Sequence, residues 1–124
     1  MKIYNVGKDS LGEYDLEYLD ERIYEYFIYN YEGYIYSGNG AGVLKDNNGK
    51  FMFIELGHCS CYGPIEERNP KCIYSLDEII KLLAKRCQDK WDKEYAEDVT
   101  KKLKELEGLK WKVITMECRK GSLI

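Results

Sequence analysis

The chain has 124 residues, of which 44% are apolar and 33% are charged, and its formal net charge is −3. This length predicts a single domain over residues 1–124, and the composition is that of a globular protein and excludes a disordered one. No apolar run reaches the roughly 20 residues of a membrane span, and residues 1–7 lack the pattern of a secretory signal, so we expect a cytoplasmic protein.

The first half of the sequence has the pattern of a β-sheet. Residues 2–6 alternate and predict a short strand, whereas residues 10–20 fit either a short helix or a strand. Three further strands are predicted over residues 23–31, 34–44 and 50–56. The segment Asp46–Gly49 predicts a hairpin turn between the last two, because Asn and Gly tolerate positive φ. Together these segments predict an antiparallel meander of three or more strands.

The strand over residues 23–31 is apolar on both faces. Alternation assigns its side chains to one face with Ile23, Phe27, Tyr29 and Tyr31, and to another with Tyr24, Tyr26 and Ile28. A strand of this kind is expected at the centre of a sheet, with other elements covering each side.

The second half changes to a helical period. Ser75–Glu78 has the form of a capping box, in which each side chain satisfies an amide at the helix start. Apolar residues at helical spacing follow it, and a second helix is predicted from about Asp92, with Gly108 as its C-terminal cap. Residues 110–117 alternate as a last strand. The predicted fold class is therefore α+β: an antiparallel sheet with the two helices of the second half packed on one face.

A segment rich in acids and tyrosines precedes and includes the first central strand. Residues 9–32 hold eight acidic side chains against one base, Arg22. Eight tyrosines lie between Glu13 and Tyr36: Tyr14, Tyr18, Tyr24, Tyr26, Tyr29, Tyr31, Tyr34 and Tyr36. Acidic charge disfavours direct contact with nucleic acid and favours a cationic partner, while tyrosine supplies contact area at low entropic cost.

The side chains expected to bind this partner are Tyr14, Asp15, Glu17, Tyr18, Asp20, Glu21 and Glu25. Two alternatives remain open. The acids could form a solubilising face, and the rings could pack the two faces of the sheet, because tyrosine is a good strand former. We expect the rings to divide between these roles.

Glycines recur at every second position in the segment Ser37–Gly42, which places them on one bare face of an extended strand. Such a face lets an aromatic ring or a ligand approach the backbone closely. The spacing matches neither the dinucleotide-binding fingerprint nor a P-loop. One alternative function is therefore binding of a small ligand, such as a signalling nucleotide, by Tyr36, Gly38, Asn39, Gly40 and Gly42.

The only histidine lies in the segment Gly57–Pro64. His58, Cys59 and Cys61, with Cys72 as a fourth ligand, have the right chemistry for zinc, although Cys-x-Cys is not the usual knuckle spacing. A thiol nucleophile would need a base beside one of these cysteines. The remaining interpretation is that this segment forms a tight structural turn. The odd count of five cysteines argues against a disulfide framework. No cofactor and no catalytic residue is predicted.

The residues at 31–33 (Tyr-Glu-Gly), 37–38 (Ser-Gly) and 56–64 (Leu-Gly-His-Cys-Ser-Cys-Tyr-Gly-Pro) resemble those of small uncharacterised proteins of phages and prophages of Gram-positive bacteria. The resemblance implies a mobile-element setting, hence the cytoplasm of an infected or lysogenic bacterium, and it assigns no site residues. Small acidic proteins in that setting are often inhibitors of host defence, such as anti-CRISPR proteins. By this analogy we expect a non-enzymatic inhibitor that binds a nucleic-acid-handling host protein with a basic groove.

Overall fold

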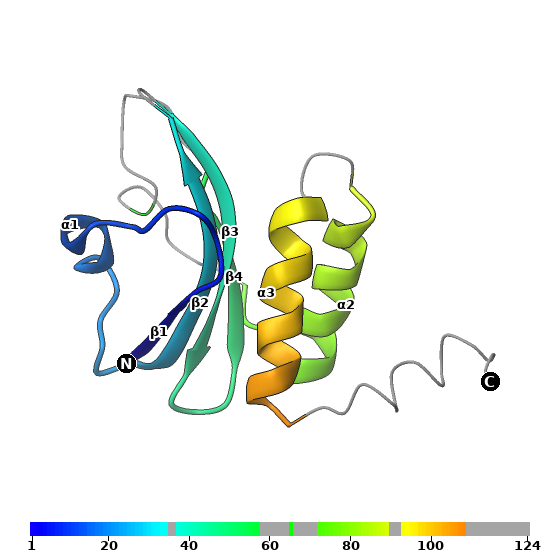
Figure 1. Cartoon of the computed structure of the whole chain (residues 1–124). Coiled ribbons are helices and arrows are strands. Elements are labelled where there is room, and N and C mark those ends of the chain that lie inside the picture. The colour runs from blue at the N-terminus through cyan, green and yellow to red at the C-terminus, as the bar shows by residue number, and fades with distance from the viewer. Residues whose placement is uncertain (35–36, 58–64, 66–71, 90–92, 109–124) are drawn as a thin grey trace.

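The computed structural model describes residues 1–34, 37–57, 65, 72–89 and 93–108. Within these ranges the chain forms four strands and three helices, arranged in three layers (Figure 1). The α+β class predicted from the sequence is confirmed. The strand predicted over residues 110–117 lies outside the described residues. Among the described residues, no helix has the length and apolar composition needed to span a bilayer.

The sheet is mixed. Its strands are β1 (Lys2–Asn5), β2 (Tyr24–Gly33), β3 (Gly38–Asp46) and β4 (Phe51–Glu55), and they lie side by side in that order. The predicted meander is present in β2, β3 and β4, which are antiparallel. The expectation of a wholly antiparallel sheet was wrong, because β1 runs parallel to β2. A parallel neighbour requires a long connection, and residues 6–23, which include the single-turn helix α1 (Glu13–Leu16), provide it.

Helices α2 (Leu76–Cys87) and α3 (Lys93–Leu106) lie together on one side of the sheet (Figure 1). The predicted capping box is present: Ser75 Oγ accepts from the Glu78 amide at 3.2 Å, and Glu78 Oε1 accepts from the Ser75 amide at 2.8 Å. The two helices and the sheet share one buried cluster, formed by Tyr26, Ile28, Val43, Phe51, Ile79, Leu83, Val99 and Leu103.

The opposite face of the sheet is covered by the β1–β2 connection, and Figure 1 shows α1 on the far side of the sheet from α2 and α3. Leu11 and Leu19 from this connection are buried against aromatic rings of β2. The full cluster is Leu11, Leu19, Phe27, Tyr29, Tyr31, Leu44, Met52, Ile54, Leu56 and Ile65. β2 is therefore covered on both faces, as its double apolar pattern predicts.

One feature of β2 departs from simple alternation. The pairing with β3 shifts between Tyr24 and Tyr26, where the register has a β-bulge. Tyr24 consequently packs against the α1-side cluster, while Tyr26 belongs to the cluster beneath α2 and α3. The expectation that Tyr24 and Tyr26 share a face was wrong, because an extra residue at a bulge reverses the alternation beyond it. Ile23, just before the bulge, is 51% exposed.

Candidate functional site

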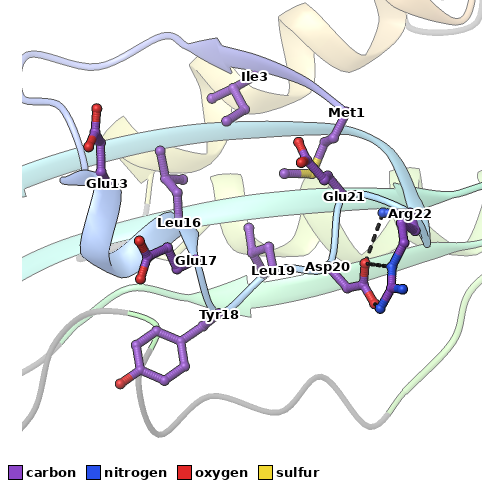
Figure 2. Close-up of a pocket in the computed structure, with 10 residues that line it drawn as sticks. All are labelled: Met1, Ile3, Glu13, Leu16, Glu17, Tyr18, Leu19, Asp20, Glu21 and Arg22. Carbon is purple, nitrogen blue, oxygen red and sulfur yellow. Dashed lines mark hydrogen bonds and ion pairs between the residues drawn. The ribbon is translucent and has the colours of Figure 1, made fainter.

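A hollow of about 630 Å³ lies between β1 and the segment from Glu13 to Arg22 (Figure 2). Its apolar part is formed by Met1, Ile3, Leu16 and Leu19. Its polar part is formed by Glu13, Glu17, Asp20, Glu21 and Arg22, and Tyr18 completes the lining. Figure 2 shows the aliphatic side chains between β1 and the segment, with carboxylates around them. We call this the acidic hollow.

The local structure explains why apolar and acidic side chains separate here. The single turn of α1 and the bend after it direct Leu16 and Leu19 toward the sheet, where Leu19 is buried. Glu13, Glu17 and Tyr18 are consequently left on the outside, and Tyr18 is 44% exposed. Ile3 is 42% exposed because β1 is the edge strand of the sheet. The hollow thus combines an apolar floor with a negatively charged rim.

The carboxylates of the rim differ in what they bind. Asp20 accepts bonds from the Arg22 amide at 2.9 Å and from Arg22 Nε and Nη2 at 3.1 Å each. These side-chain and backbone bonds from Arg22 hold the pKa of Asp20 below its ordinary value. Asp20 therefore serves the turn that leads into β2. Among the described residues, Glu13, Glu17 and Glu21 form no ion pair, so their charge is available to a partner.

A second hollow, of about 550 Å³, lies on the other face of β1. It is lined by Met1, Lys2, Tyr4, Glu21, Tyr24, Glu25, Tyr26, Asn47 and Leu106, so it shares Met1 and Glu21 with the acidic hollow. The described part of its lining holds one basic side chain, Lys2, against the acids Glu21 and Glu25. Lys45 Nζ is 3.6 Å from Glu25 Oε2 and 2.9 Å from Glu107 Oε2. We call this the aromatic hollow.

The structure brings together four of the seven side chains predicted to bind a partner: Glu17, Tyr18, Asp20 and Glu21 all line the acidic hollow. Glu25 does not line the acidic hollow but lines the aromatic hollow, which Glu21 also lines. Asp15 is half-buried on α1 and lines neither hollow. The side chain of Tyr14 lies outside the described residues.

Most of the described tyrosines of the segment belong to the core. Tyr26, Tyr29 and Tyr31 are buried, and the Tyr29 hydroxyl accepts a bond from the Leu11 amide at 3.0 Å. Tyr34 is exposed, and its hydroxyl donates to Glu32 Oε1 at 3.1 Å. The rings thus mainly pack the sheet, and the aromatic contribution to the acidic hollow comes from Tyr18.

Sequence reasoning missed the apolar floor. Met1, Ile3 and Leu16 are unremarkable in the sequence, and they meet only because β1 pairs parallel to β2 beneath the α1 connection. No local pattern reports that pairing. The one available signal was the alternation of residues 2–6, which predicted a strand but not its neighbour.

The glycines of β3 lie close to β2. A Cβ on Gly42 would be 2.6 Å from Phe27 Cε1 and 3.0 Å from the Ile28 carbonyl oxygen. A Cβ on Gly40 would collide with the Asn30 carbonyl oxygen. Gly42 therefore lets Phe27 of the α1-side cluster pack closely on β3, and Gly40 lets the β2 backbone at Asn30 approach it. Of the predicted ligand-binding residues, Asn39 is exposed and Tyr36 lies outside the described residues, and neither hollow includes any of this set.

Of the four predicted metal ligands, Cys72 is the one that lies among the described residues. His58, Cys59 and Cys61 lie outside the described residues, and Cys72 is an exposed free thiol. Within the described ranges, no group of three His, Cys, Asp or Glu side chains has the geometry to hold a metal ion.

No protein-family model matches the chain, and neither a curated protein nor a solved structure matches it. The acidic hollow and its surroundings are consequently the features that indicate a function.

Proposed function

We propose that this chain is a phage-encoded, non-enzymatic inhibitor of a host defence system, comparable to an anti-CRISPR protein. It binds a nucleic-acid-handling host protein by docking a basic surface of that protein in the acidic hollow. The observation that carries the proposal is the combination of an apolar floor, a carboxylate rim and the exposed side chains Ile3 and Tyr18 at one edge of the sheet.

Arginine and lysine fit such a hollow because each has an aliphatic stem and a charged head. The stem packs on apolar surface such as Ile3 and Leu16, while the head reaches carboxylates at the rim. Glu13, Glu17 and Glu21 suit this role because Asp20 is already engaged by Arg22. The apolar contact supplies affinity, and the unpaired acids steer the encounter and select cationic partners.

The chain inhibits its partner by covering the surface with which the partner binds nucleic acid. A protein that binds nucleic acid contacts the phosphates through lysine and arginine side chains. Rim carboxylates that pair with the same lysine and arginine side chains compete with those phosphates. The phage setting is supported by the resemblance carried by residues 31–33, 37–38 and 56–64, and within that setting the acidic charge of residues 9–32 supports the role of an inhibitor by analogy.

The test is capture of host proteins from a lysate of a Gram-positive bacterium. The immobilised chain is compared with Glu17→Lys/Glu21→Lys, which reverses the charge of the rim. The matched control, Glu94→Lys/Glu97→Lys, changes the net charge equally but on α3, on the other side of the sheet (Figure 1). A captured partner is then purified and mixed with labelled nucleic acid.

We expect the chain and the α3 variant to retain the partner and to displace the nucleic acid from it. The rim variant should associate several-fold more slowly at low salt, and the difference should shrink as salt screens the charges. Equal association of the two variants, or a partner that still binds nucleic acid in the presence of excess chain, contradicts the proposal.

A further inference from the structure

The acidic hollow lies beside an unpaired strand edge. β1 is the first strand in the sheet order, and among the described residues only β2 pairs with it. An open edge presents backbone donors and acceptors that another chain is able to extend. The groups that face outward decide whether a partner strand can bind there.

The ladder to β2 identifies the outward groups. The Val6 amide donates to the Tyr29 carbonyl at 2.8 Å, so Val6 directs its backbone groups toward β2. Backbone groups of successive strand residues alternate between the two edges. Lys2 and Tyr4 therefore also face β2, while the amides and carbonyls of Ile3 and Asn5 face the open edge.

The two hollows lie on opposite faces of this same strand. The acidic hollow includes Ile3, and the aromatic hollow includes Lys2 and Tyr4. Side chains of an added strand would also alternate between the two faces. Every second side chain of such a segment would be directed toward the acidic hollow, and the intervening ones toward the aromatic hollow.

The charges of the hollows specify the side chains that fit. The acidic hollow carries Glu13, Glu17 and Glu21, which form no ion pair among the described residues, and the basic side chain in its lining, Arg22, is held by Asp20. It suits arginine or lysine. The aromatic hollow is less acidic, because Lys2 lines it and Lys45 pairs with Glu25, and it offers the apolar surfaces of Tyr4, Tyr26 and Leu106, so it suits an apolar side chain.

We infer that the partner contributes an extended segment, with basic and apolar residues in alternation, that adds to the sheet beside β1. This inference rests on the proposed docking of a basic partner and specifies how that partner binds. Backbone bonds to Ile3 and Asn5 hold the segment in register. The acidic hollow binds the basic side chains of the segment, and the aromatic hollow binds the apolar ones.

The probe is the peptide Arg-Val-Arg-Val-Arg with blocked ends, and its affinity is measured by calorimetry. Two derivatives carry methyl groups on backbone nitrogens. One is methylated at both valines, and the other is methylated at the second and third arginines. Charge and side chains are unchanged in both. Because N–H groups alternate between the edges of a strand, one set faces β1 and the other faces solvent.

We expect N-methylation of one set to lower the affinity about tenfold or more and methylation of the other set to change it less than about twofold. Amide exchange of Ile3 and Asn5 should slow on saturation with the unmodified peptide, while that of Tyr4 should change little. The peptide Glu-Val-Glu-Val-Glu should not bind.

The outcomes separate strand addition from simple charge docking. If both methylated peptides bind as well as the parent, and Glu17→Lys/Glu21→Lys weakens all three, strand addition is overturned and the proposed function stands. If the arginine and glutamate peptides bind alike, the proposed function fails as well. If sedimentation shows that the chain is already a dimer whose Ile3 amide is protected without peptide, a second copy occupies β1, and the inference is overturned.

Discussion

Replacement of Gly42 by alanine tests whether the glycines of β3 serve packing. The new methyl group would lie 2.6 Å from Phe27 Cε1 and 3.0 Å from the Ile28 carbonyl oxygen, so either the ring or the strand must move. Overpacking of this kind costs about 1–3 kcal/mol. Loss of glycine's flexibility in the unfolded chain offsets about 0.5–1 kcal/mol. We expect a net loss of about 1–2 kcal/mol in the free energy of unfolding.

The assay is urea unfolding, followed by far-ultraviolet circular dichroism, with thermal unfolding as a second measure. A loss of this size should lower the melting temperature by about 5 °C in a chain of this length. The matched control is Gly12→Ala. Gly12 is exposed with φ of −74°, and its added Cβ would meet only Asp15 Oδ2, at 3.8 Å, so stability should change by less than about 0.5 kcal/mol.

A double-mutant cycle identifies the ring as the cause. In a Phe27→Leu background the Cε1 and Cζ atoms that crowd Gly42 are absent, so Gly42→Ala should cost about 1 kcal/mol less than in the parent. An equal cost in both backgrounds, or a Gly42→Ala variant as stable as Gly12→Ala, refutes the packing argument. The glycines of β3 would then need an explanation other than packing of the core.

Two further predictions concern stability. Ser75→Ala removes one half of the capping box at the start of α2, so it should lower the free energy of unfolding by about 1 kcal/mol, as measured by thermal unfolding. Ser75→Asp keeps an acceptor and should lower it less. Burial and the bond from its hydroxyl to Glu107 raise the pKa of Tyr26 above the ordinary value of tyrosine. The neutral form is favoured in the folded state, so its stabilising contribution is present below the unfolded pKa of about 10 and is lost as pH rises beyond it. The urea midpoint of Tyr26→Phe should therefore fall less between about pH 9 and about pH 11 than that of the parent, and parallel declines would count against this role for Tyr26.

Much of the fold was predictable from local chemistry. The turn at Asp46–Gly49 is as expected, with Gly49 at a φ of 81° and Asp46 Oδ1 accepting from the amides of Asn48 and Lys50. The capping box at Ser75 and the C-terminal glycine at Gly108, with a φ of 70°, were equally local signals. Each depends on residues within a few positions of one another, which is why a single sequence reveals them.

The parts that could not be predicted depend on distant residues. The parallel direction of β1 depends on its pairing with β2. In that pairing Ile3 lies opposite Phe27, which is more than twenty positions away in the sequence. The bulge that separates Tyr24 from Tyr26 is a property of the pairing with β3 and not of β2 alone. The acidic hollow shows the same division. Glu17, Asp20 and Glu21 lie close together in the sequence and were predicted to bind a partner, whereas the apolar floor is assembled by the sheet and was not predicted.

The long connection between β1 and β2 has a consequence for the order in which the chain folds. β2, β3 and β4 are joined by short segments and lose little chain entropy when they pair, whereas β1 docks only after residues 6–23 have been confined. The amino-terminal strand should accordingly be the last piece to join and the first to detach when conditions become mildly denaturing. Recognition would then disappear while the remaining three strands and both long helices are still intact.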